Sequence, residues 1–216
     1  MTDLFGVRFD PGSAIPGPTF PAADVGTELM QVREIFRRFD SAACQVRVLG
    51  PLSIRTFNGP VEDGIRPGAL KLAALLALYH VRGRTIAELG VLWPDAAGAK
   101  VPNLRKNDLM SLRRDGLKRD ILAGNGPRDG YAAEFVPYRF GRYRLDPRCV
   151  GVDLACFQQL RDLATRTCHA RVRVAAAEAA LSLCGGEPLE GIQEAWAVVP
   201  RTVLRRDVET VRTLLS

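Results

Sequence analysis

The sequence has no long hydrophobic run. Its longest apolar stretch, residues 69–79, covers about 11 positions and already contains Lys71, whereas a membrane-spanning helix needs about 20. The first twenty residues lack a basic segment followed by an apolar core, so no secretory signal is expected. Hydrophobic residues nevertheless make up 47% of the chain, near the globular average, which excludes general disorder. We therefore expect a soluble, cytoplasmic protein that does not bind a membrane.

Cysteine and histidine are sparse and unpaired. The five cysteines form no CxxC pair, and the two histidines, His80 and His169, lie far apart in the chain. Zinc ligation needs closely spaced soft ligands, and a catalytic cysteine needs a convergent histidine. Neither pattern is present, so we expect free thiols in a reducing compartment and no metal site.

Motifs for catalysis are missing as well. The sequence contains no evident nucleophile–base pair and no constellation of carboxylates. Gly124-Asn125-Gly126 lacks the preceding strand and following helix that a phosphate-binding loop requires. We therefore expect a protein that is not an enzyme, with no catalytic residue and no cofactor.

Lysine is scarce, because 26 of the 30 basic residues are arginine, and the positive charge is unevenly distributed. Residues 44–146 hold 17 basic and 10 acidic residues, a net charge of +7, whereas residues 1–43 carry −2 and residues 147–216 carry +1. A basic segment beside nearly neutral ones is typical of a surface for a polyanion, most commonly nucleic acid. An ordinary solvated basic face is the alternative.

The first third of the chain predicts a tail, a helix and a small sheet. Residues 1–26 are rich in Pro, Gly and Ala and predict a loop or tail. Residues 27–39 have apolar positions at helical spacing, with Thr27 as the expected cap, and predict a helix that docks on the domain that follows. Alternating segments on either side of Pro51 and a turn at 58–60 predict an antiparallel sheet of two or three strands.

Two helices are expected next. The first opens with Pro67 and is apolar almost all round, which is typical of a core helix. The second is short. It begins with Thr85 and Glu88 at capping-box spacing and ends at Trp93-Pro94.

A third helix, predicted over residues 102–118, carries the candidate binding residues. At helical spacing Leu109, Leu112 and Gly116 fall on one side, and Arg105 lies awkwardly toward this apolar side. The opposite side holds amides, cations and one apolar residue: Asn103, Lys106, Asn107, Met110, Arg114 and Lys118. Such side chains can contact adenine edges, guanine or phosphate, and a thymine methyl group. This set suits a major groove, although an ordinary solvated helix face would look similar.

A basic hairpin follows a predicted loop at residues 120–134. Segments 135–138 and 142–145 flank Arg139-Phe140-Gly141, with Tyr143 and Leu145 expected to face the core and Arg142 and Arg144 to face outward. The order of sheet, three helices and hairpin predicts an α+β winged helix-turn-helix with an N-terminal antiparallel sheet. Its third helix would enter the major groove, and Arg139 or Arg142 would reach a minor groove or phosphates.

From Val46 onward the chain resembles a known family. The segments VRVLGPLSI, TIAELGVLWPD, SLRRDGL, GRYRL, VDLACFQQL and EAALSLCGGEPLEG occur in the order found in SARP-type actinobacterial transcriptional regulators. These proteins join a response-regulator-like winged helix to a bacterial transcriptional activator domain (BTAD), a helical array similar to tetratricopeptide (TPR) repeats. The resemblance covers residues 44–216 and implies that helix 102–118 is the recognition helix and GRYRL the wing. We thus predict an N-terminal extension at 1–43, a winged-helix DNA-binding domain at 44–146, and a partial TPR-like BTAD at 147–216.

The same resemblance implies an all-α segment after the wing. Residues 153–167 and 171–184 would form its first antiparallel pair, and residues 203–215 a third helix. The expected contact stripes are Leu154, Phe157, Leu160 and Leu163 on one helix and Val172, Ala175, Ala179 and Leu183 on the other. The family's domain usually continues for several helices beyond the position of Ser216, so an apolar edge that seeks a partner is expected.

Two functions from different classes remain open at this stage. The first is a DNA-binding transcriptional regulator with double-stranded DNA and RNA polymerase as partners. The second is a protein-interaction or dimerisation module, in which the winged helix is a scaffold and 147–216 binds a second copy or a helical partner.

Overall fold

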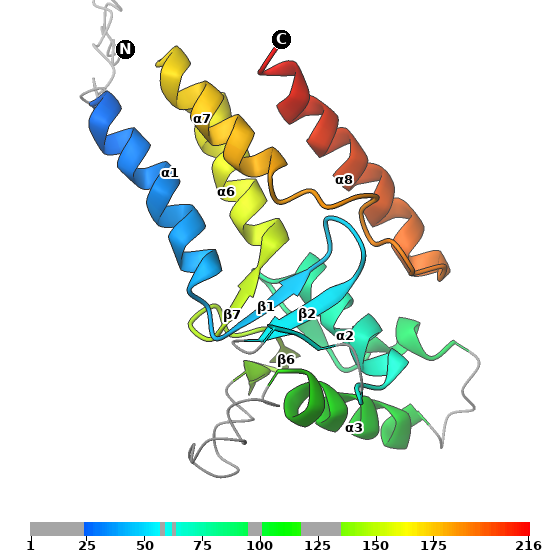
Figure 1. The fold of residues 1–216 in the computed structure, drawn as a ribbon. Coiled ribbons are helices and arrows are strands. Elements are labelled where there is room, and N and C mark those ends of the chain that lie inside the picture. The colour runs from blue at the N-terminus through cyan, green and yellow to red at the C-terminus, as the bar shows by residue number, and fades with distance from the viewer. Residues whose placement is uncertain (1–23, 57–58, 62–63, 95–100, 118–134) are drawn as a thin grey trace, which may run out of the picture.

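Helices and two small sheets make up the fold, which is mixed α+β (Figure 1). The computed structural model describes residues 24–56, 59–61, 64–94, 101–117 and 135–216. The α-helices are α1 (Val25–Asp40), α2 (Pro67–Leu78), α3 (Val101–Ser111), α6 (Asp153–Arg166), α7 (Ala170–Leu181) and α8 (Ala195–Thr213). A 3₁₀ helix, η1 (Glu88–Leu92), precedes α3, and a π-helical turn, η2 (Leu112–Gly116), follows it. The predicted loop at residues 120–134 lies outside the described residues, as does most of the predicted tail at 1–26.

The larger sheet has four strands rather than the two or three predicted. Its order is β3-β2-β1-β7, from β1 (Cys44–Arg47), β2 (Ser53–Thr56), β3 (Gly59–Pro60) and β7 (Val150–Val152). The first three strands are antiparallel as expected, but β7 runs parallel to β1, with Val46 opposite Val152. Gly151 in β7 lies close to Phe39 near the end of α1, since a Cβ on Gly151 would be 2.9 Å from the carbonyl oxygen of Phe39.

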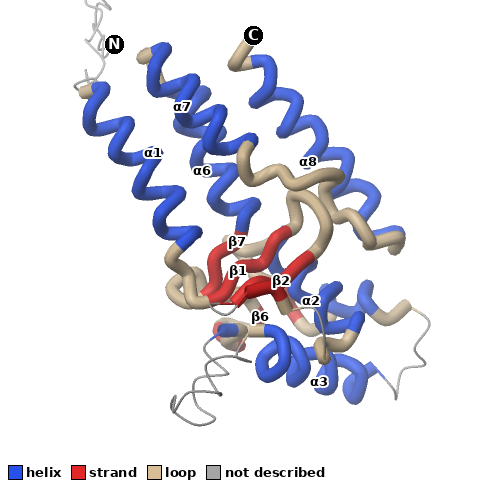
Figure 2. Tube along the Cα trace, viewed as in Figure 1, coloured by secondary structure: helices blue, strands red, loops and turns tan. Residues whose placement is uncertain are grey.

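The strands lie between two groups of helices. Figure 2 shows α1, α6, α7 and α8 on one side of the larger sheet and α2 with α3 on the other. The smaller sheet has the order β4-β6-β5, from β4 (Arg84–Thr85), β6 (Arg142–Tyr143) and β5 (Tyr138–Arg139). The predicted hairpin therefore exists, but each strand has two residues instead of four.

Helix α1 begins two residues earlier than predicted and has a different cap. The side chain of Asp24, not Thr27, accepts a hydrogen bond from the backbone N–H of Gly26 at 3.2 Å. The helix packs chiefly on α6 and α7, and less on β7, so its expected docking on the domain that follows was wrong in its main contact. The hydroxyl of Thr167, at the end of α6, donates to Glu28 on α1 at 2.5 Å.

The helices α6 and α7 form the expected antiparallel pair. The predicted α6 stripe is buried in full, whereas the α7 stripe is wrong in part because Ala175 and Ala179 are only half-buried. The buried residues from α7 onward are Val172, Ala176, Ala177, Ala180 and Leu183. Helix α8 starts at Ala195 rather than at residue 203 and accommodates Pro200 in its second turn. No helix in the described ranges is long and apolar enough to cross a membrane.

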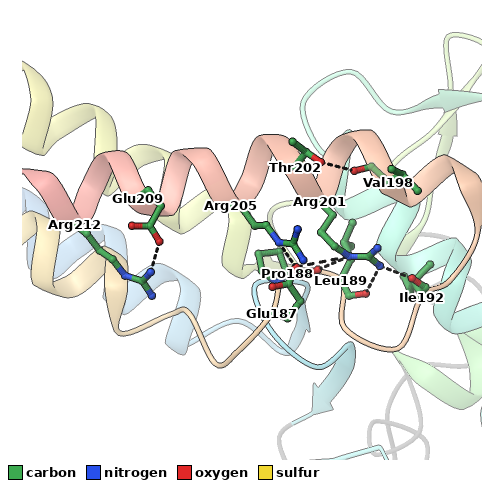
Figure 3. A network of polar contacts seen from close by, with 10 residues as sticks. All are labelled: Glu187, Pro188, Leu189, Ile192, Val198, Arg201, Thr202, Arg205, Glu209 and Arg212. Carbon is green, nitrogen blue, oxygen red and sulfur yellow. Dashed lines mark hydrogen bonds and ion pairs between the residues drawn. The ribbon is translucent and has the colours of Figure 1, made fainter.

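The helical part and the larger sheet are joined by backbone hydrogen bonds. In the segment between α7 and α8, the N–H of Gly185 donates to Leu49 at 2.9 Å and that of Leu189 donates to Val48 at 2.8 Å. Arg201 on α8 holds this segment in turn, because its guanidinium donates to the carbonyl oxygens of Pro188, Leu189 and Ile192 (Figure 3). These contacts connect α8 to the turn between β1 and β2.

A buried carboxylate strengthens the same junction. Asp153, the first residue of α6, accepts hydrogen bonds from the backbone N–H groups of Val48 and Leu49 at 2.8 and 2.9 Å, and from that of Leu154 at 2.7 Å. Burial raises the pKa of Asp153 to about 6, and the three N–H donors oppose this rise.

Candidate nucleic-acid interface

The candidate residues on α3 share one exposed face. Asn103, Lys106, Asn107 and Met110 are exposed on α3, and Arg114 is exposed in the η2 turn that follows. The opposite side is buried as predicted, through Leu109, Leu112 and Gly116. Lys118 lies outside the described residues, and Arg105 is half-buried. The chain thus presents amides, a lysine, a methionine and an arginine along one helical surface.

A buried carboxylate fixes α3 against its neighbours. Asp108 is 3% exposed; its Oδ1 accepts from Nε of Arg66 and its Oδ2 from Nε1 of Trp93, both at 2.9 Å. One turn further, the hydroxyl of Ser111 accepts from the backbone N–H of Arg66 at 3.1 Å. These bonds join α3 to the start of α2 and to the end of η1. This role of Asp108 was not predicted from the sequence, although an acidic residue between Leu104 and Leu109, on a helix with a buried side, was a signal for it.

The start of α2 approaches this carboxylate very closely. A Cβ on Gly68 would lie 2.2 Å from Oδ2 of Asp108. No real Cβ contact is that short, so only glycine fits here without a shift of α3 or of the carboxylate. Gly68 and Asp108 together therefore determine how α3 sits on α2.

The helix does not continue as a regular α-helix to residue 118, as was predicted. A π-helical turn begins at Leu112, and the N–H of Leu117 donates to the carbonyl of Leu112 at 2.9 Å. Gly116 lies so close to the core that a Cβ would be 2.7 Å from Cδ1 of Ile65 and 3.2 Å from Cδ1 of Ile54. Only glycine fits at position 116 without a shift of these side chains. Single π-helical turns within α-helices are frequent at functional sites.

The start of η2 contacts the base of the hairpin. Arg113, next to the exposed Arg114, donates to the carbonyl oxygen of Val136, two residues before β5. Burial lowers the pKa of the Arg113 guanidinium. Arg113 therefore has a structural role, because its hydrogen bond connects the end of α3 with the hairpin.

The two predicted hairpin arginines differ in their surroundings. Arg139 on β5 is exposed, whereas Arg142 on β6 is half-buried and donates to Oε2 of Glu88 at 3.2 Å. Glu88 also forms the predicted capping box with Thr85, through N–H bonds of 2.7 and 3.2 Å. The Thr85 N–H, followed by its hydroxyl and by Arg142 and Arg84, lowers the pKa of Glu88. Arg142 is thus partly neutralised by an ionised partner.

Arg114 has a weaker local partner. Its guanidinium donates to the neighbouring Asp115 at 2.8 Å, with the arginine side chain 67% exposed. Exposed ion pairs of this kind contribute little to stability. Arg114 can therefore exchange Asp115 for an external anion at small cost.

The described residues contain no cluster of three or more His, Cys, Asp or Glu side chains that could hold a metal ion. Burial raises the pKa of the Cys156 thiol to about 12. A thiol with so high a pKa is a poor nucleophile at neutral pH.

Comparison with known proteins supports the fold. No family model matches the chain, and no curated protein matches it either. The solved structure of Mycobacterium tuberculosis EmbR in complex with a low affinity phosphopeptide is similar to it, with a TM-score of 0.62 and 21% sequence identity. The match covers 79% of this chain and 44% of that chain. The chain therefore shares its fold with less than half of the length of EmbR.

Proposed function

We propose that the chain is a DNA-binding transcriptional regulator. In this proposal residues 44–146 form a winged-helix DNA-binding domain, with α3 in the major groove and the β5–β6 hairpin as a wing on the backbone or in the minor groove. Residues 147–216 form a TPR-like helical segment, and residues 1–43 an N-terminal extension. The resemblance to SARP-type regulators and the fold shared with EmbR support this assignment.

The observation that carries the proposal is that α3 is held firmly on its buried side while its opposite face is exposed. Asp108 fixes the helix from its buried side, while Asn103, Lys106, Asn107 and Met110 stay in solvent. Amides and cations on one rigid helical face can read base edges, because the geometry of each hydrogen bond is set before DNA arrives.

Substitutions on this face test the proposal. A pool of random duplexes is first enriched for binding to the wild-type chain, and the selected duplex is then titrated by fluorescence anisotropy. Asn107→Ala should weaken binding to the selected duplex by roughly 5- to 150-fold if the amide contacts a base, with little change for unselected DNA. Lys106→Ala should weaken binding to both duplexes if it contacts phosphate.

Arg206→Ala on α8 is the matched control for the loss of one charge. Arg206 is exposed, and α8 lies across the sheet from α3 (Figure 1). This variant should bind DNA as the wild type does. If all three variants bind the selected duplex as tightly as the wild type does, α3 is not the recognition helix.

An exposed apolar surface on α8 supports a second candidate function, a protein-interaction or dimerisation module. Val198, Val199 and Val203 are 52%, 71% and 52% exposed on the same broad side of the helix. Light scattering of the chain without DNA distinguishes the two functions. The interaction module would be favoured if the chain is a dimer, if Val199→Asp makes it monomeric, and if the chain does not bind DNA.

A further inference from the structure

The tip of the β5–β6 hairpin holds a bulky residue in an unfavourable conformation. Arg139 and Arg142 face each other, so the turn consists of Phe140 and Gly141 only. Both turn residues have positive φ, 52° for Phe140 and 75° for Gly141. Such a turn favours Asn, Asp or Gly at its first position, and a bulky residue there is an outlier. The conformation of the turn therefore does not explain why residue 140 is a phenylalanine.

The phenylalanine ring contributes nothing to the stability of the hairpin either. Phe140 is 101% exposed, whereas the aromatic pair that supports the strands is Tyr138 with Tyr143, whose ring centroids lie 4.7 Å apart. A single exposed apolar residue is ordinary on a protein surface. A fully exposed aromatic ring on a strained backbone is not, and strain of this kind is typical of a functional position.

The charges at the tip also favour an external partner. Arg139 and Arg142 lie directly opposite each other across the two strands, and like charges in that register destabilise a hairpin. Glu88 compensates Arg142 at 3.2 Å, but Arg139 is exposed and has no ion pair within the described part of the chain. A polyanion at the tip would relieve this repulsion.

We propose that Phe140 is an aromatic wedge that enters the minor groove of DNA and stacks against a base step, while Arg139 contacts the flanking phosphate. This inference rests on the proposed function and names the part of the wing that acts on DNA. Proteins that insert apolar side chains into the minor groove unstack a base step and kink the duplex there. Steps of T followed by A unstack most readily.

The test uses the full chain and a short duplex of alternating A and T in which one adenine is replaced by 2-aminopurine, whose fluorescence rises when it unstacks. Phe140→Asn removes the ring and places a residue that tolerates positive φ in the turn. This variant should bind the duplex roughly 5- to 100-fold more weakly, since stacking of a base on an aromatic ring has about that effect. The fluorescence rise should disappear. The melting temperature of the protein without DNA should increase by roughly 2–4 °C, because the strain at position 140 is relieved.

Two further variants separate a wedge from a general surface effect. Phe140→Leu keeps an apolar wedge and should retain part of both the affinity and the fluorescence rise. Met30→Gln removes an exposed apolar side chain from α1, an element that does not form part of the proposed DNA-binding domain, and should change neither.

The outcomes distinguish the two proposals. If wild-type chain fails to bind any duplex even at low salt, the proposed function itself is wrong. If wild type and Phe140→Asn bind DNA equally, with equal fluorescence, the wedge is wrong and the DNA-binding function stands. A loss of binding to another protein, with DNA binding unchanged, would likewise overturn the wedge.

Discussion

The position of α3 depends on a contact that a double-mutant cycle can measure. Gly68 and Asp108 approach so closely that a methyl group on residue 68 would overlap the carboxylate, at 2.2 Å from Oδ2 and 2.6 Å from Cγ. Gly68→Ala should therefore destabilise the wild-type chain, but it should cost almost nothing once Asp108 has been replaced by alanine. The two substitutions should be strongly coupled.

The magnitudes follow from the contacts. Gly68→Ala overfills a packed site, which costs about 1–3 kcal/mol. Asp108→Ala leaves the indole N–H of Trp93 without its acceptor, about 1–3 kcal/mol, and the bond to the half-exposed Arg66 adds about 0–1 kcal/mol. In the Asp108→Ala background the carboxylate is gone, and alanine gains on glycine by up to about 1 kcal/mol in a helix. The coupling free energy should thus be about 1–4 kcal/mol.

Urea unfolding followed by circular dichroism gives the four unfolding free energies of the cycle. Gly90→Ala in η1 is the matched control, because a Cβ there would meet no atom within 4 Å. This control should change stability by under about 1 kcal/mol in either background. If Gly68→Ala and Asp108→Ala add within about 0.5 kcal/mol, the carboxylate does not occupy the place described and the anchoring of α3 is refuted.

Two further predictions concern the junction between the sheet and the helices. Because the pKa of Asp153 is raised to about 6, its carboxyl keeps a proton in the native chain that it loses in the unfolded chain between about pH 4 and 6. The contribution of Asp153 to the unfolding free energy should therefore fall by up to about 3 kcal/mol as the pH rises from 4 to 7. Subtracting the urea-unfolding curve of Asp153→Asn isolates this contribution, and a pH-independent difference would contradict it. Arg201→Met should lower the unfolding free energy by about 2–4 kcal/mol, since three carbonyl groups lose a charged donor. Arg205→Met removes only an exposed bond to Glu187 and should cost under about 1 kcal/mol (Figure 3). If thermal melts show that the two variants lose equal stability, Arg201 does not hold the segment between α7 and α8 as described.

Elements with a clear apolar period were predictable from the sequence. The α6 stripe repeats at helical spacing, and its four members are all buried. The strand Val150–Val152 was missed because three residues with a central glycine are too few to show a period, although valine favours strands. The segment becomes a strand through its pairing with β1. The start of α8 was missed because Pro200 usually ends a helix, whereas here it lies one turn inside α8.

The candidate interface was predictable in part for the same reason. Helical spacing separates the exposed and buried sides of α3 without any knowledge of neighbours. The anchor at Asp108 depends on Arg66 and Trp93, which are brought to it by tertiary packing. Likewise, the partial neutralisation of Arg142 depends on Glu88, which lies 54 positions earlier in the chain. Spacing within one element cannot reveal such partners.

The most direct test of the central claim is the binding of the wild-type chain to duplex DNA at several salt concentrations, measured by fluorescence anisotropy. If α3 and the hairpin neutralise about three to five phosphates, the logarithm of the affinity should fall with the logarithm of salt with a slope of about −3 to −4.5. No binding at low salt, or an affinity that does not change with salt, would contradict a DNA-binding function.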